Sequence, residues 1–325
     1  MNPFDYLSPD LVLNSVEQSF NLILDPQIIP FPSYINRVYG IKTDEGQDLV
    51  VKFYRPGRWS PEALEEEQNF IFDCQEAELP VIAPLPDPEG YTLGEVELGI
   101  PSGETLVYNF SVFEKKAGRV FDAEGDGDWL RLGRLLGRLH EVGRREKFNH
   151  RIKNSPGLTE KQVLKLLPLV HPDVKSEWED IIFTSLELVK ASFEGQSFHR
   201  IHGDCHRGNI LNRDPQGLLL MDFDDCQMGP PVQDLWLLLP GAREECHRET
   251  VLLSEGYREF SDSGKLNWDL VEPLRFMRMV HFLTWCSSQK EDKGFDHHFP
   301  GWGTRSFWIR ETEDFRDQLR RLNPD

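Results

Sequence analysis

Residues 202–225 read HGDCHRGNILNRDPQGLLLMDFDD, and this stretch decides what kind of fold the chain can have. A carboxylate, Asp204, stands five residues before an amide, Asn209. The apolar run LLLM that follows is typical of a short buried strand, and Asp222 stands where this strand would end. Three oxygen-bearing side chains therefore have fixed spacings around one predicted strand, and they fit a single mechanism.

The spacing is that of the protein kinase catalytic loop, H-R-D-x-x-x-x-N. In that pattern the Asp accepts the proton of the acceptor hydroxyl, and the Asn binds magnesium. A second Asp, at the end of the next strand, holds the metal that bridges the nucleotide phosphates. We therefore predict Asp204 as the proton acceptor and Asn209 and Asp222 as Mg²⁺ ligands, with Asp222 also counted as catalytic and ATP as the co-substrate.

Composition limits the class of protein. The 325-residue chain carries a formal net charge of -19, which argues against nucleic acid as a partner because phosphate backbones bind basic surfaces. No stretch approaches the ~20 apolar residues that cross a bilayer, and the N-terminus lacks the basic region and apolar run of a signal peptide. Five cysteines without a C-x-x-C pair argue against a disulfide framework. We expect a cytoplasmic monomer that binds no membrane.

ATP is strongly anionic, so an acidic protein needs identifiable cations where ATP binds. Lys52 is the first candidate, because the β-branched and aromatic run at 49–54 predicts a strand. A lysine on a central strand of a small sheet can reach the α and β phosphates. A surface lysine on an edge strand is the alternative.

A helix should follow this strand. Ser60 before a proline and an acid is typical of a helix start. On that helix Glu67 shares the inward face with Leu64, and an inward carboxylate needs a partner that offsets its desolvation. We therefore predict that Glu67 pairs with Lys52, with Glu66 as the competitor for this role.

Two further segments are candidates for nucleotide contacts. Residues 33–41 suggest two strands and a tight turn at the place where a kinase covers the phosphates, but no G-x-G-x-x-G loop is present. The side chains of Asn36 and Arg37 would supplement the backbone amides there, although an ordinary hairpin turn explains these residues equally well. Farther along, a strand that ends near Phe113 and Lys115 would offer its backbone to the adenine.

The second half of the chain shows the apolar spacing of helices. Trp129, Leu132 and Leu136 recur at this spacing, so residues 129–142 predict a buried helix beneath the catalytic loop. A helix that begins near Asp234 would let this carboxylate brace the catalytic loop, although capping of free amides explains an acid there equally well. Five more segments suit helices: residues 160–167, 175–191, 251–260, 268–287 and 312–322.

These elements predict an α+β fold with two lobes that share a cleft. Residues 1–115 would form a small nucleotide-binding lobe with an antiparallel sheet. Residues 116–325 would form a larger, mostly helical lobe that holds the catalytic groups and binds the acceptor.

Several segments together resemble one known family. The pattern H-G-D-x-H-x-x-N, followed by a strand that ends in Asp, is similar to the aminoglycoside phosphotransferase and choline kinase superfamily, whose fold is protein-kinase-like. Within it, the chain resembles the bacterial stress response kinase A family more closely. The segments that carry this second resemblance are SYxNRVY at 33–39, VVKFYRPxRW at 50–59, HGDCHxGNIL at 202–211, DxDD at 222–225, QDLW at 233–236 and PLRxMR at 273–278.

The resemblance implies a cytoplasmic, ATP-dependent serine/threonine protein kinase of the stress-response type, whose protein substrate it does not identify. It implies the same roles for Asp204, Asn209 and Asp222 as the spacing does. The superfamily motifs alone would favour a small-molecule kinase with an aminoglycoside-, choline- or homoserine-like acceptor. A non-catalytic nucleotide-binding regulator is the third possibility, but such a protein would be expected to have lost a catalytic group, and here Lys52 and the three oxygen-bearing residues are all present.

Other polar residues near the motif allow simpler explanations. Cys205 and His206 have no further Cys or His at zinc spacing, so we expect His206 to order the catalytic loop. His202 is expected to bond backbone around Asp204 and not to exchange protons. Asp224 and Asp225 are candidates for assisting the metal, with solvation or loop bonding as equal alternatives.

Overall fold

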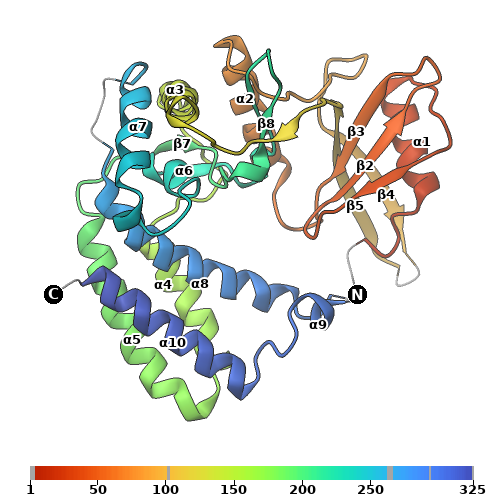
Figure 1. Cartoon of the computed structure of the whole chain (residues 1–325). Helices are drawn as coiled ribbons and strands as arrows, with labels where there is room; N and C mark the ends of the chain where they lie inside the picture. The colour runs from red at the N-terminus through yellow and green to blue at the C-terminus, as the bar shows by residue number, and fades with distance from the viewer. Residues whose placement is uncertain (1–3, 101–102, 262–265, 293, 324–325) are drawn as a thin grey trace.

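A computed structural model describes residues 4–100, 103–261, 266–292 and 294–323. It confirms the α+β prediction, because a twisted sheet occupies the N-terminal part and helices make up most of the rest (Figure 1). The predicted boundary at residue 115 directly follows the last strand of this sheet and stays a prediction. Among the described residues, no helix has the length and apolar character needed to cross a membrane.

The N-terminal sheet has five antiparallel strands in the order β1-β2-β3-β5-β4. Lys52 therefore lies on the central strand, as predicted, and the edge-strand alternative is wrong. The strands are β1 (Ile29–Phe31), β2 (Arg37–Lys42), β3 (Asp48–Phe53), β4 (Gly94–Gly99) and β5 (Thr105–Glu114).

The two faces of this sheet differ, because side chains alternate along each strand. Leu49, Val51 and Phe53 on β3 are buried in a core cluster with helix α1 (Pro9–Phe20). Lys52 points to the other face, where it pairs across the sheet with Ser111 of β5. The apolar face thus fixes the register and directs the lysine toward the second part of the molecule.

Helix α2 (Pro61–Glu76) follows β3 and begins where the sequence predicts. The hydroxyl of Ser60 accepts a hydrogen bond from the amide of Ala63, which caps the helix. Leu64 and Glu67 are both buried at 1% exposure, as the helical spacing indicates. Glu67 is therefore an acid on the inward face, with consequences for its choice of partner.

The helical part is held together by two apolar clusters and by one close helix crossing. At this crossing, a Cβ on Gly133 of α3 would overlap the carbonyl oxygen of Leu253 on α7, so the approach requires glycine. The helices are α3 (Asp126–Gly143), α4 (Pro156–Leu166), α5 (Pro172–Ser192), α6 (Val232–Trp236), α7 (His247–Arg258), α8 (Val271–Gln289), α9 (Phe295–His298) and α10 (Arg305–Leu322). All seven helices predicted for this half of the chain overlap these helices, although α10 begins seven residues before the predicted position 312.

Short strands flank the motif at residues 202–225. The predicted strand forms as β9 (Leu218–Leu220), which pairs with β8 (Ile210–Asn212), and β8 pairs with β6 (Arg119–Val120). On the other side of the catalytic loop, β7 (His199–Ile201) pairs with β10 (Gln227–Gly229). These pairings place the catalytic loop and the segment after β9 beside each other.

Candidate active site

One buried carboxylate holds the start of the catalytic loop. Asp234 on α6 accepts hydrogen bonds from the backbone amides of His202 and Gly203, both at 2.8 Å. Its second contact is the Nε2 of His140 on α3, at 3.0 Å. Asp234 is 0% exposed, so water does not compete for these bonds. Of the two explanations left open for Asp234, bracing of the catalytic loop is the correct one.

Gly203 lets the catalytic loop lie against the segment after β9. Its φ is +85°, a left-handed conformation that favours glycine, and a Cβ there would overlap the carbonyl oxygen of Asp225. The ring of His202 lies on the other side of the same contact, where its Nε2 is 3.0 Å from the carbonyl of Met221. His202 therefore bonds backbone, as expected, but its partner is the carbonyl of Met221, just before Asp222, and not backbone around Asp204.

Asp204 presents an ionised carboxylate beside the guanidinium of Arg278 and the imidazole of His206. Its Oδ1 accepts a hydrogen bond from Nη2 of Arg278 at 3.0 Å, and its Oδ2 lies 3.5 Å from Nε2 of His206. Burial would raise the pKa of Asp204, but the hydrogen bond with His206 and the charge of Arg278 lower it well below its ordinary value. Asp204 is therefore in the form that can accept a proton.

Asn209 and Asp222 offer oxygen atoms of the kind that magnesium prefers. The amide nitrogen of Asn209 donates to the carbonyl of Asp204 at 3.0 Å, which leaves its Oδ1 as a ligand atom. Asp222 has a φ of 62°, a strained conformation for a residue other than glycine, and its side chain is 52% exposed. The buried ring of Phe223, packed on Phe70 at 5.7 Å, anchors the segment below. This strain directs the carboxylate out of the core.

Lys52 reaches this pair from the sheet. Its Nζ lies 2.8 Å from Oδ1 of Asp222 and 3.6 Å from Oδ1 of Asp224, and the whole residue is 8% exposed. Burial would lower the pKa of the ammonium, yet the carboxylates of Asp222 and Asp224 raise it well above its ordinary value. The structure thus brings together Lys52, Asn209, Asp222 and Asp204, which the sequence singled out.

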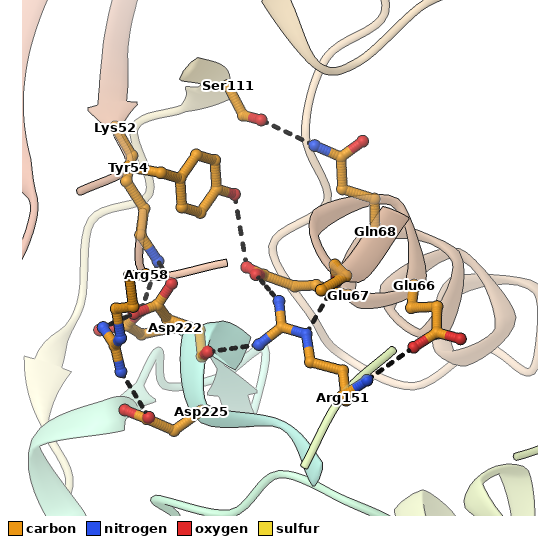
Figure 2. A network of polar contacts seen from close by, with 12 residues as sticks. Lys52, Tyr54, Arg58, Glu66, Glu67, Gln68, Ser111, Arg151, Asp222 and Asp225 are labelled. Atoms are coloured by element: carbon orange, nitrogen blue, oxygen red, sulfur yellow. Dashed lines mark hydrogen bonds and ion pairs between the residues drawn. The ribbon is translucent and has the colours of Figure 1, made fainter. Parts of the chain in front are cut away.

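The predicted ion pair between Lys52 and Glu67 is wrong. Glu67 instead accepts a hydrogen bond from Nη2 of Arg151 at 2.6 Å, and the Arg151 side chain is completely buried (Figure 2). Nη1 of the same guanidinium donates to the carbonyl of Asp224, and Nε donates to the carbonyl of Ala63 on α2. Because Lys52 turns toward the carboxylates after β9, the cation in direct contact with the inward acid of α2 is Arg151, while Lys52 acts on it without a direct bond.

Glu66 does not pair with Lys52 either. Its carboxylate accepts hydrogen bonds from three consecutive backbone amides, those of Asn149, His150 and Arg151. Together with the guanidinium of Arg151, these bonds fasten the start of α2 to the segment that follows α3 (Figure 2). Arg151 is a site residue that the sequence reasoning missed.

Asp224 and Asp225 are held by Arg58, which the sequence reasoning also left without a role. Both terminal nitrogens of Arg58 are bonded, one to Asp224 and the other to Oδ1 of Asp225 at 2.6 Å. Asp224 is 4% exposed, and its Oδ1 has no hydrogen-bond partner among the described residues. Bonds within the loop therefore account for most contacts of Asp224 and Asp225. The Oδ1 of Asp224 faces the ammonium of Lys52 at 3.6 Å, so it is an oxygen of the kind that suits a divalent cation.

The structure corrects the predictions for Asn36 and Arg37. Arg37 pairs with Phe53 across the sheet, so its side chain lies on the face opposite Lys52, with its guanidinium 4.7 Å from the ring of Phe4. Asn36 is buried, and its side chain donates to Oδ2 of Asp224 at 3.1 Å and accepts from the amide of Arg55 at 3.1 Å. Arg37 thus lies away from Lys52, and Asn36 holds Asp224 and the backbone of Arg55.

The predicted adenine contact lies at the end of β5. Phe113 is half-buried and pairs with Val50, on the sheet face of Lys52. The amide of Lys115 donates to the carbonyl of Asp48 at 3.1 Å and is engaged in the sheet. Since hydrogen bonding alternates along an antiparallel pair, the backbone of Glu114 points away from β3. On that side Pro84 forms an antiparallel β-bridge with Phe113, and the amide of Leu85 donates to the carbonyl of Val112 at 2.7 Å, so the segment around Pro84 covers the backbone there.

A cavity of about 320 Å³ opens beside Asp204. Its walls come from the catalytic loop, the segment after β9, helices α4 and α8, and the loops before β2 and α2. Its lining residues include Arg58, Asp204, Asp225, Arg278 and His281, with Phe282 and Trp285 farther along α8.

Beside this cavity, segments that are distant in sequence contact each other. Tyr34, in the loop before β2, packs edge-on against Trp285 of α8 at 5.4 Å between ring centroids. Close by, both oxygens of Asp292 accept hydrogen bonds from Nη2 of Arg55 at 2.8 Å, in an ion pair whose side chains are 11% and 9% exposed. The sheet lobe is therefore fastened to the C-terminal helices.

Comparisons with known proteins agree with this arrangement. A family model described as "Phosphotransferase enzyme family" matches residues 27–273. Serine/threonine protein kinase RdoA of Salmonella typhimurium is 34% identical over 98% of this chain and 95% of its own length. Stress response kinase A of Escherichia coli K12 is 33% identical over 98% of this chain and 94% of its own length. The solved structure of amicoumacin kinase hAmiN, in complex with AMP-PNP, Ca2+ and Ami, has a TM-score of 0.75 at 15% identity, covering 99% of this chain and 95% of that one.

Proposed function

The chain belongs to the phosphotransferase enzyme family, and from this premise we propose that it is a MgATP-dependent kinase whose acceptor is a serine or threonine hydroxyl of a protein. The family match and the two curated relatives confirm the resemblance stated from the sequence, and with it a kinase that acts on a hydroxyl. The name of the Salmonella relative, a serine/threonine protein kinase, supports the protein acceptor.

One observation carries the proposal: the carboxylate of Asp204 faces a cavity that the phosphate-binding residues do not line. Asp204 is in the wall of this cavity, whereas Lys52, Asn209 and Asp222 are not. Asn209 is nevertheless tied to the backbone of Asp204 by a hydrogen bond. An acceptor hydroxyl and the nucleotide phosphates would therefore approach the same residue from two sides.

The residues suggest the following division of labour. Lys52 binds the nucleotide phosphates in place of its present contact with Asp222. Asn209 and Asp222 would hold Mg²⁺, which supplies charge neutralisation of the phosphates when it is bound. Asp204 orients the acceptor hydroxyl toward the γ-phosphate and accepts its proton. The oxygen attacks phosphorus as the bond to the β-phosphate oxygen breaks, so ADP leaves.

The adenine would lie against the cleft face of the sheet. Val38, Val50 and Phe113 are half-buried on the face that carries Lys52, and they offer apolar contacts to a flat ring. The backbone at the end of β5, residues 113–115, would supply the hydrogen bonds to the adenine.

A small-molecule acceptor is the second candidate, because the cavity beside Asp204 has the volume of a small-molecule site. Incubation with labelled ATP separates the two. The protein should be given ATP alone, with a generic protein substrate, and with a panel of small alcohols. Phosphate on a protein serine or threonine supports the proposal, and transfer to small alcohols alone would refute it.

Replacing Asp222 by alanine should abolish tight nucleotide binding in the presence of magnesium. The variant loses a metal ligand and the carboxylate nearest Lys52. Isothermal titration with ATP, with and without Mg²⁺, measures the effect. Asp269→Ala is the control, because that side chain is 83% exposed in a surface ion pair with Arg243. An Asp222→Ala protein that binds MgATP as the wild type does would contradict the assignment.

A further inference from the structure

The wall of the cavity beside Asp204 has four charged side chains, and they form two ion pairs. Asp225 is bonded to Arg58, and Asp204 is bonded to Arg278. The other lining residues are apolar or uncharged amides, apart from His281, whose Nδ1 lies 2.9 Å from Nε2 of Gln162. Both carboxylates in the wall are thus already compensated by a guanidinium.

The two arginines differ in how many of their N–H donors are already bonded. Both terminal nitrogens of Arg58 are bonded to carboxylates, and its side chain is 20% exposed. Arg278 uses only Nη2, in its contact with Asp204, among the contacts of the described residues, and its side chain is 45% exposed. A guanidinium carries five N–H donors, so Arg278 has donors to spare at the cavity.

The position of Arg278 decides which part of an acceptor it can reach. An acceptor hydroxyl must come within hydrogen-bond distance of Asp204 to give up its proton. Arg278 is already 3.0 Å from that carboxylate, so its free donors lie next to the atoms bonded to the acceptor oxygen. Guanidinium donors match carboxylate oxygens in a planar, two-pronged geometry.

We propose that Arg278 selects acceptors that carry a carboxylate beside the hydroxyl, which for a protein acceptor means a serine or threonine with aspartate or glutamate as a neighbour. The inference rests on the proposed function and specifies its substrate class. Cationic alcohols are disfavoured at the same site, because an ammonium would meet Arg278 and find both wall carboxylates paired.

The net charge of -19 does not oppose this selection. Repulsion between the whole protein and an acidic substrate acts at long range and is screened within about 10 Å at 0.1 M salt. The bond to Arg278 acts in direct contact, in a partly enclosed cavity where screening is weaker. The preference should therefore be a property of one residue and not of the overall charge.

The test compares three peptides that differ only beside a single serine, with glutamate, alanine or lysine as its neighbours. Choline and glycerate serve as cationic and anionic small alcohols. The full-length wild type is compared with R278Q, which removes the charge, and with R278K, which keeps the charge without the planar fork. R275Q is the matched control, because Arg275 lies one turn earlier on α8, is bonded to Glu272, and does not line the cavity.

The readout is the ratio of kcat/KM for the glutamate and lysine peptides within each protein, which does not depend on the fraction of folded enzyme. The wild type and R275Q should favour glutamate by about tenfold or more, the usual worth of a charge-assisted hydrogen bond. R278Q should show nearly equal values, and R278K should fall between.

Equal use of the three peptides by the wild type, or an unchanged preference in R278Q, would overturn the role of Arg278 and leave the protein-kinase proposal standing. Transfer to choline or glycerate with no peptide product would overturn both proposals. Absence of transfer to any of these acceptors, in a protein that binds MgATP, would also count against both.

Discussion

Replacing Asp204 by asparagine should lower turnover by about 10²- to 10⁴-fold, the usual contribution of a general base. The amide has nearly the same shape as the carboxylate, and it can still accept a hydrogen bond from Arg278, but it cannot take up the hydroxyl proton at neutral pH. MgATP should bind almost as tightly as to the wild type, because Asn209 meets the backbone of residue 204 and not its side chain. Turnover with an accepted substrate and titration with MgATP measure the two effects.

Asp225→Asn is the matched control for this variant. Asp225 lines the same cavity, but its carboxylate is bonded to Arg58 and not to Arg278 or His206. The same chemical change there should cost much less turnover. Equal losses in the two variants, or normal turnover in Asp204→Asn, would show that Asp204 is not the base.

Replacing Arg151 by methionine should destabilise the fold by about 3–5 kcal/mol, the usual cost of removing one partner of a buried ion pair. Glu67 is 1% exposed, and without the guanidinium its charge loses the cation 2.6 Å away. The carbonyls of Ala63 and Asp224 lose a donor as well. Chemical denaturation of wild type and variant measures the difference in free energy of unfolding.

The pH dependence of the Arg151→Met variant provides a separate test. Burial already raises the pKa of Glu67, with Lys52 and Arg151 acting in the opposite direction, so loss of Arg151 should raise it further. A carboxyl whose pKa is raised by folding binds protons more readily in the folded state, so it makes stability fall as pH rises. The difference in free energy of unfolding between wild type and variant should therefore become smaller as the pH is lowered toward the raised pKa of Glu67.

Arg138→Met is the control. Arg138 also fastens α2 to the helical lobe, but it does so through the carbonyls of Ala77 and Glu78, and no buried carboxylate depends on it. Arg138→Met should lower the free energy of unfolding by less than Arg151→Met does, and this loss should not change with pH. If both variants lost the same stability at every pH, the pair formed by Arg151 and Glu67 would be no more than one packing contact among others.

The catalytic loop could be predicted from sequence because its geometry is local. Asp204 and Asn209 are held by a bond within the loop, and Asp222 follows a strand that pairs with its neighbour through a short hairpin. The spacing therefore carries most of the information. The direction of the Lys52 side chain could be predicted for a related reason. Side chains alternate along β3, so the sequence shows which of them share the face of the lysine.

Partners that come from far along the chain could not be predicted in this way. The helical spacing shows that Glu67 points inward, but the cation that meets it is 84 positions later, after α3. The error at Arg37 has another cause. The sequence suggests two strands and a tight turn within residues 33–41, whereas Arg37 begins β2 and pairs with Phe53, so its side chain lies on the face opposite Lys52.

One omission had a visible signal. Helix α1 was not predicted, yet Ser8 stands before Pro9 and Asp10 just as Ser60 stands before a proline and an acid at α2. The hydroxyl of Ser8 accepts from the amide of Leu11, in the same capping arrangement. The serine, proline and acid at residues 8–10 thus predict a helix that begins at Pro9.

The fastening of the sheet lobe to the C-terminal helices bears on how a protein could be phosphorylated at all. Separating the lobes would break the ion pair between Arg55 and Asp292 and the packing of Tyr34 on Trp285. A folded surface is too broad to follow a serine into a space of about 320 Å³. In the proposed reaction with a protein acceptor, the serine or threonine would have to arrive on a disordered tail or on a loop that unfolds locally. Disorder in the substrate protein would then matter more than an extended docking surface.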